Sequence, residues 1–563
     1  MELSSSETDT QPEIETAQDD TYSGDASFLY SSKINGTVDI SGICEILVES
    51  NAFSLALDSS GRIFFKENGR LRTQILNIET TNSEMGMAVS GHSDFMIANP
   101  ADSAVFSFSK ALDLMLADKK LFNGAFGFPT ESARIFMRPI AIRVDGDEEH
   151  ELFVPYIRIY AGGIISISLT SVLGFEDLTA QEVVYRETNK SQANINSVLC
   201  EKTLHLACTE CQISQIPFRE RIAQKKGFEA LINSTLGAPE KIEFADEILT
   251  VYELVHTSHF TLSDIARNLL SVVARAVYSG EVKTRINWVG KQYRDDSIGE
   301  YWHGKPVLNV RSHTRQQLSS AENWALHQVM VRSVMMRVYL ADFVPHEFMP
   351  LSDMRTFDDF NSFYSESVSL SLSSAQVESY IENNSTYTFN NLVSDIQVLN
   401  EASHFILIYY SYASLGLDKC KKAIDVARLE LHILKFEESL ISAHKYGEIA
   451  RYIEVVRRGS HLTTVCNILH KKVETVRKAL ELDEKISSES YTRRITVIFG
   501  IIASATLSPE LMQPLAKLYG FTFDEQVGKV VGMAASVVVV VGILTLTHYV
   551  FRSFSSVLRK FRL

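Results

Sequence analysis

Hydrophobic and polar residues alternate over the first third of the chain, which is the pattern of β-strands. The alternation is clearest in Ile135–Val144 and Phe153–Leu169, with the turn-rich segment Asp145–His150 between them. Gly162–Gly163 interrupts the second run and predicts a further turn. The segment from Ser27 to about Thr170 is therefore predicted to consist mainly of strands.

Farther along the chain, apolar residues recur with the spacing of helices. Two helices are expected at Phe218–Thr235, before Gly237, and at Leu262–Tyr278, which begins beside Asp264. With the strands, they predict an α+β or α/β domain over residues 26–360. After about residue 370 the expected elements are helices, at Ala375–Ile381, Phe389–Leu415, Asp418–His444 and Tyr446–Arg458.

A last helix is expected to begin near Ser460 and to carry a regular apolar seam. Its apolar residues repeat at steps of three and four, the spacing that packs against neighbouring helices: Leu462, Val465, Leu469, Val473, Val476 and Leu480. No Gly or Pro occurs between Leu462 and Ile495. The helix is therefore expected to continue to Tyr519, over about 80 Å.

Two apolar segments near the end of the chain predict a membrane hairpin. Val530–Phe551 contains no charged residue and would form about 33 Å of helix, enough to cross a hydrocarbon core. Ile495–Leu518 is a second candidate span, although it carries Glu510 and Lys517. Basic residues flank the hairpin at both ends, so both termini are expected in the cytoplasm.

Composition adds three expectations to this pattern. The 563 residues carry a formal net charge of −15, which argues against direct binding of nucleic acid. Residues 1–25 are acidic, without the apolar core of a signal peptide, and predict a disordered tail. The six cysteines are expected to be reduced thiols. The predicted location is the inner or plasma membrane of a prokaryote, as a multi-pass protein.

The expected fold is an α+β or α/β cytoplasmic domain followed by a helical bundle, a long stalk helix and a two-helix transmembrane hairpin. Its predicted parts are a disordered acidic tail (1–25), the α/β domain (26–360), a helical domain (361–459), the stalk helix (460–494), a first transmembrane helix (495–518), an extracytoplasmic loop (519–529), a second transmembrane helix (530–551) and a basic cytoplasmic tail (552–563).

This order of parts resembles the CorA family of divalent-cation channels. The residues that carry the likeness are Thr496, Ile501, Ile502, Ala503, Ser504, Leu507, Pro509, Tyr519 and Gly520, with the basic tail Arg552–Arg562. The family's signature is Gly-Met-Asn, whereas this chain has Gly520-Phe521-Thr522. The resemblance implies a homopentamer in a lipid bilayer, with the first span lining a pore. It also implies Mg²⁺ or another divalent cation as the permeant or gating ion, and no redox cofactor.

A helical wheel of the first span places a small or polar stripe on one side. Within about 40° of one line lie Thr496, Gly500, Ala503, Leu507, Glu510 and Pro514, which are the expected pore-lining residues. Five copies of Glu510 would form a carboxylate ring that attracts cations, or Glu510 would lie at interface depth and pair with Lys517. The expected selectivity loop contains Tyr519, Gly520, Phe521, Asp524 and Glu525.

One basic segment differs from the rest of this acidic chain. Lys283–Arg315 holds seven Lys or Arg residues against three Asp or Glu, interleaved with aromatic residues. Guanidinium groups beside aromatic faces suit a nucleotide, whereas the alternative is a solvated loop with ordinary salt bridges. The expected residues for a small adenine-nucleotide messenger are Arg285, Trp288, Lys291, Arg294, Trp302, Arg311 and Arg315.

A second cluster has residue types that bind zinc. It comprises Cys200, His205, Cys208 and Cys211, which together could close a tetrahedral site. The spacing is irregular and no second Cys-x2-Cys pair occurs. The alternative is that these are small buried residues of the core.

No motif of a hydrolase, nucleotide phosphatase or dinucleotide-binding enzyme occurs, so we expect no enzymatic activity. The first functional hypothesis is a CorA-like ion channel gated by a nucleotide messenger, similar to the membrane effectors of type III CRISPR antiviral defence. The second is a divergent magnesium or divalent-cation transporter gated by intracellular metal. The third is a membrane-anchored binding protein that conducts no ions.

Overall fold

A computed structural model describes residues 20–542 with internal gaps. The gaps are 35, 84–85, 93–96, 98, 108–130, 257–258, 293–297, 341–350, 352, 356–357, 384–387, 443–453, 521–523, 525, 529, 532–533, 536–537 and 539–541. The chain divides into two compact units. The first comprises Met1–Asp418 and Leu429–Lys471, and the second comprises Lys419–Arg428 and Lys472–Leu563.

The first unit is built on one large mixed sheet, with 15 strands in the described part of the chain. The strands of the chain are β1 (Thr21–Ile34), β2 (Leu55–Asp58), β3 (Arg62–Glu67), β4 (Arg70–Ile75), β5 (Asn77–Ser83), β6 (Gly86–His92), β7 (Ser132–Phe136), β8 (Ile140–Val144), β9 (Glu151–Tyr160), β10 (Ile164–Ser171), β11 (Phe175–Thr179), β12 (Ile195–Glu201), β13 (Glu240–Phe244), β14 (Glu247–Glu253), β15 (Ile298–His313), β16 (Phe360–Tyr364) and β17 (Ser369–Ser373). Strands β5 and β6 form a separate hairpin.

The long path through the sheet runs β13-β14-β12-β8-β9-β10-β1-β15-β17-β16, and β7 pairs with β9 beside this path. Neighbours on the path are antiparallel except β15 and β17, which are parallel. The first strand therefore lies in the middle of the sheet, between β10 and β15.

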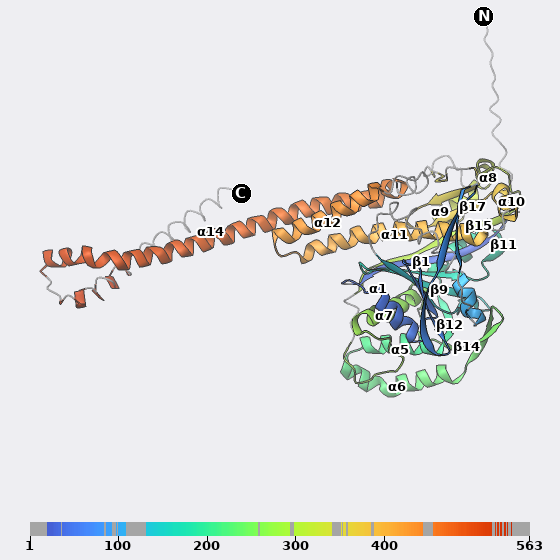
Figure 1. Ribbon diagram of the computed structural model, residues 1–563, viewed down its shortest axis with the longest axis horizontal. Coiled ribbons are helices and arrows are strands. Elements are labelled where there is room, and N and C mark those ends of the chain that lie inside the picture. Colours follow the sequence, from blue (N-terminus) through green and yellow to red (C-terminus); the bar gives the residue numbers. More distant parts are fainter. Residues whose placement is uncertain are drawn as a thin grey trace, which may run out of the picture. The chain divides into compact units, whose positions relative to one another are not determined.

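Helices cover the sheet and continue the chain beyond it. They are α1 (Ile40–Glu49), α4 (Ala180–Glu182), α5 (Lys202–Gln215), α6 (Phe218–Gly237), α7 (Leu262–Ser279), α8 (Ser320–Leu326), α9 (Gln328–Met336), α10 (Ala375–Asn383), α11 (Phe389–Lys419), α12 (Ala423–Ser442) and α14 (Ser460–Leu518). Within the first unit, α5, α6 and α7 lie on one side of the sheet and α11 on the other (Figure 1).

Most of the periodic segments form the elements that the sequence predicts. The two glycines separate β9 from β10, and Gly163 adopts a left-handed φ of +82°. Helix α7 begins with a capping box in which Thr261 and Asp264 bond reciprocally. Helix α14 begins at Ser460 and continues to Leu518, which confirms the prediction of one unbroken helix.

The boundaries of the sheet differ from the predicted ones. Strand β1 begins at Thr21, inside the segment expected to be a disordered tail, because it pairs with β11 and β15. Strands β16 and β17 lie inside the predicted helical domain. They are strands because β17 extends the sheet beside β15.

The predicted transmembrane hairpin is corrected by the structure. Among the described residues, no helix has both the length and the apolar character needed to cross a membrane. Residues 495–518 instead form the end of α14, where Glu510, Lys517 and two prolines interrupt the apolar sequence. Residues 530–551 lie largely outside the described part. The multi-pass membrane location is therefore not supported, and the fold is an α/β fold with a large mixed sheet.

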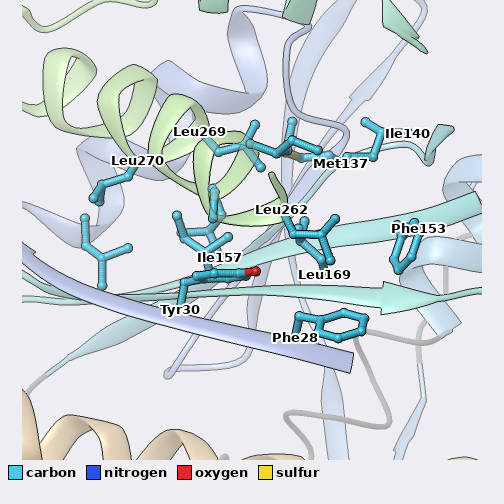
Figure 2. Packing of buried hydrophobic residues seen from close by; sticks show 14 of the residues in the cluster. Phe28, Tyr30, Met137, Ile140, Phe153, Ile157, Leu169, Leu262, Leu269 and Leu270 are labelled. Carbon is cyan, nitrogen blue, oxygen red and sulfur yellow. The ribbon is translucent and has the colours of Figure 1, made fainter. Parts of the chain in front are cut away.

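An apolar core fills the space between the sheet and α7. Figure 2 shows Leu262 and Leu269 of α7 beside Ile157 and Leu169 of the strands, with Tyr30 from the central strand below them. All five side chains are at most 2% exposed. This side of the sheet is an ordinary hydrophobic interface.

Candidate functional site

The opposite side of the sheet is polar although it is buried. Successive side chains of a strand point to opposite faces, so one strand can supply both surfaces. In β10, Ile165 and Ile167 belong to the apolar core, whereas Ser166 and Ser168 lie on the other face, which α11 covers. Both serines are at most 2% exposed.

Four residues form a row across adjacent strands on this face. Arg134 of β7 is opposite Arg158 of β9, Arg158 is opposite Ser166 of β10, and Ser166 is opposite Ser31 of β1. The Ser166 and Ser31 hydroxyl oxygens are 3.3 Å apart. The row therefore begins with two guanidinium groups, on β7 and β9, and ends with two hydroxyl groups, on β10 and β1.

Helix α11 supplies the anion of this interface. The two terminal nitrogens of Arg134 donate to the two carboxylate oxygens of Glu401 over 2.7 and 2.8 Å. Arg158 approaches the same carboxylate, with Nη1 3.5 Å from Oε2, and donates from Nη2 to Ser132 over 3.3 Å. One carboxylate is therefore held between two guanidinium groups.

Amide and hydroxyl groups extend the contact along α11. Ser27 donates to Gln397 over 3.1 Å, and Gln397 donates to Ser168 over 3.3 Å. One turn later, Asn400 donates to Ser369 over 3.2 Å. These bonds fix α11 on the strands through polar partners rather than through apolar packing alone.

Two basic side chains complete the buried face. His404 Nδ1 lies 3.0 Å from the hydroxyl oxygen of Ser31. The Lys305 side-chain nitrogen lies 3.4 Å from the centre of the Tyr364 ring, and Lys305 is fully buried. No hydrogen-bond acceptor for this nitrogen occurs in the described part of the chain. Burial lowers the pKa values of Lys305 and His404 well below their ordinary values.

The charge state of Glu401 follows from its neighbours. Burial by itself would raise the pKa of this carboxyl group. The charges of Arg134 and Arg158 and the bonds from Arg134 outweigh the burial, so the pKa of Glu401 is lowered. The site thus contains one ionised carboxylate between two guanidinium cations. These three groups together carry a net positive charge. The chemistry of the site is that of anion recognition.

The predicted nucleotide residues do not form one site through any contact in the described structure. Arg311 lies 3.2 Å from Asp25 in an ion pair, and Arg315 is paired with Asp20. Trp288 instead packs against α6, with ring centres 6.3 Å from Phe228. Of the others, Arg285 and Lys291 are exposed, Trp302 lies in β15 opposite Ser31, and Arg294 lies outside the described residues.

The predicted zinc ligands lie in the hydrophobic core. Cys200 is the next-to-last residue of β12, Cys208 and Cys211 lie on α5, and all three belong to the apolar cluster. His205 lies with Nε2 3.3 Å from the Thr235 hydroxyl oxygen. No group of three or more His, Cys, Asp or Glu within the described ranges is arranged to hold a metal ion. This packing matches the alternative of small buried residues.

The predicted pore and loop residues lie at the end of α14 or after it. Thr496, Gly500 and Ala503 are exposed on the helix, and Thr496 donates to the carbonyl of Thr492 over 2.8 Å. Leu507, Glu510 and Pro514 are also in α14, Tyr519, Gly520 and Asp524 follow it, and Phe521 and Glu525 lie outside the described residues. Their expected roles depended on the transmembrane hairpin, which the described helices do not support.

The residues of the buried polar face were not singled out from the sequence. The alternation of Ser with Ile in β10 indicates that this strand has one polar and one apolar face. A face of serines is usually exposed to water, so the pattern does not indicate a buried site. Neither a family model, nor a curated protein, nor a solved structure matches this chain. The function must therefore be argued from the site itself.

Proposed function

We propose that this chain is a ligand-gated effector that acts without catalysis, in which the sheet senses a ligand and α11 transmits its binding. The observation that supports this is the bidentate Arg134–Glu401 pair buried between the sheet and α11. A buried ion pair contributes little net stability compared with apolar groups of the same volume. Its proposed role is to hold α11 in one of two arrangements on the sheet, as a switch requires.

Helix α11 also connects the sensor to the rest of the chain. Asp418 is the last residue of this helix in the first unit, and Lys419 is the first residue of the second unit. Inside the second unit, the backbone of Ala423 donates to Glu484 of α14 over 3.2 Å. A displacement of α11 along its axis would therefore reach α14 through the chain itself.

We take α14 as the output element and a second copy of the chain as its partner. Leu482 and Ile486 are 59% and 56% exposed and lie four residues apart, on the same side of the helix. The helix also carries both signs of charge, as in the 2.5 Å pair of Lys478 and Glu474. An exposed apolar stripe flanked by mixed charges is typical of helices that associate with their own copies.

The test compares two double variants by sedimentation velocity and by hydrogen exchange. Arg134→Met with Glu401→Met removes the bidentate bond between the sheet and α11 and takes the Glu401 carboxylate away from Arg158, so it should change how α11 is held on the sheet. We expect altered exchange in residues 419–428 and 472–518 and an altered oligomeric state. The matched control, Arg275→Met with Glu210→Met, replaces a buried ion pair between α5 and α7 and should leave both properties unchanged. Identical behaviour of the two double variants would refute the proposal.

A further inference from the structure

Arg134 and Arg158 occupy directly opposed positions on the antiparallel strands β7 and β9. Like charges in this relationship destabilise the pairing of strands. The two residues are only 1% and 8% exposed, so water screens their repulsion poorly. The strands can keep this pair buried because an anion lies against both guanidinium groups.

The present anion, Glu401, belongs to α11 and not to the sheet. Its two oxygens meet the fork of Arg134 in the geometry that guanidinium groups use for carboxylates and for phosphates alike. Without Glu401, the described residues of this site would carry the two positive charges of Arg134 and Arg158 and no negative charge. A phosphate group with two negative charges would match them better than a single carboxylate does.

The surroundings also supply donors for further phosphate oxygens. The Ser132 hydroxyl is 3.3 Å from Nη2 of Arg158. Ser166 is the partner of Arg158 on the next strand, about 4.8 Å away across the ladder. A carboxylate has two oxygens, whereas a phosphate monoester presents three that need donors. Two guanidinium groups and two hydroxyls provide such donors on one face.

We propose that Arg134, Arg158, Ser132 and Ser166 form a binding site for the phosphate group of a ligand, which Glu401 occupies until that ligand replaces it. This inference rests on the proposed function and names the chemistry of the ligand that would move α11. Binding exchanges one set of charge-assisted hydrogen bonds for another, so no covalent step is involved. The ligand can bind only when α11 moves and takes the Glu401 carboxylate out of the site.

The experiment removes the internal carboxylate and supplies an external anion. Glu401→Ala removes the Glu401 carboxylate from both arginines, and the full-length variant is heated with inorganic phosphate, with adenosine monophosphate or with acetate. Sodium chloride at equal ionic strength is the reference. We expect each phosphate compound to raise the Tm by about 3 °C or more, and acetate to raise it less. A stronger effect of the nucleotide would assign the phosphate to an organic ligand.

Two controls distinguish phosphate binding at this site from a non-specific stabilisation of the protein by phosphate. Glu210→Ala removes the carboxylate from a buried pair with the single Arg275, so phosphate should stabilise it less than Glu401→Ala. Adding Arg158→Met to Glu401→Ala should abolish the phosphate effect. Equal phosphate shifts in all three proteins, or none in Glu401→Ala, would overturn the inference. If Glu401→Ala does not fold, Glu401→Gln keeps the side-chain volume and should give the same order of responses.

The outcome is distinguishable from failure of the proposed function. Phosphate binding by Glu401→Ala with no change in the oligomeric state of the wild type would support the site and count against the effector. A change of oligomeric state in the Arg134→Met and Glu401→Met variant, without any phosphate effect, would support the effector and remove this site.

Discussion

Arg134 and Glu401 form a bidentate ion pair although they are 267 positions apart in the chain, with bond lengths of 2.7 and 2.8 Å. Both side chains are buried, so the pair joins the sheet to α11 in surroundings of low dielectric constant.

Breaking this pair should cost much more than replacing it. Glu401→Gln leaves Arg134 without its charged partner and should lower the free energy of unfolding by about 3–5 kcal/mol. Arg134→Met with Glu401→Met should recover only part of that loss, since Arg134 no longer carries a buried charge but the buried Arg158 still loses the Glu401 carboxylate. Urea denaturation of the single and double variants measures both effects. A double variant that loses the sum of the two single effects would contradict this account.

His327 should make the protein sensitive to mild acid. Burial and the neighbouring His313 lower the pKa of His327 to about 4, while Tyr22 bonds to its ring over 2.9 Å. The unfolded state therefore binds more protons than the folded state between about pH 6.5 and 4, and stability falls as the pH falls. His327→Gln should flatten this dependence by up to about 3 kcal/mol. The exposed His432→Gln variant is the control, in chemical denaturation across that range.

Lys305 should affect stability over a more alkaline range. Because its folded pKa is well below the ordinary 10.5, the unfolded state binds the extra proton and stability rises with pH up to about 10.5. Lys305→Met removes a buried polar group and should raise the free energy of unfolding at pH 7 by about 1–3 kcal/mol and weaken the pH dependence. The exposed Lys241→Met variant should do neither. A destabilised Lys305→Met protein would show that the amine has a partner it needs.

Gly24 should tolerate no side chain. A Cβ atom there would lie 2.2 Å from the backbone carbonyl oxygen of Asn309 on β15, which no change of side-chain rotamer can move away. Gly24→Ala should therefore cost about 1–3 kcal/mol or more by forcing β1 and β15 apart. Gly162→Ala is the matched control, because nothing lies within 4 Å of its new methyl group. Thermal unfolding of the two variants makes the comparison.

The stripe on α14 should govern self-association. Leu482→Glu places a charge on the exposed apolar side of the helix and should shift the protein toward monomers in sedimentation equilibrium. Ser488→Glu adds the same charge elsewhere on α14 and should have little effect. A monomeric wild type at all concentrations would remove the second copy as the partner of α14.

The local elements of this fold could be predicted and the candidate site could not. Alternation in Phe153–Leu169 and the glycines within it contain the information for two strands and their turn, because strand geometry acts between near neighbours. Which face of those strands is buried depends on distant residues. Ser166 and Ser168 resemble a solvent-facing row until α11, more than 200 positions later, covers them.

The position of β1 has a consequence for synthesis. This strand begins at Thr21, yet its partner on one side ends at His313, and Tyr22 is opposite that residue. At roughly 5–20 residues per second, the ribosome needs about 15–60 s to make the intervening chain. The middle strand of the sheet therefore emerges early, with both edges open until β10 is made and with one edge open until β15 follows. During that interval it is a target for chaperones and for mispairing with other nascent chains.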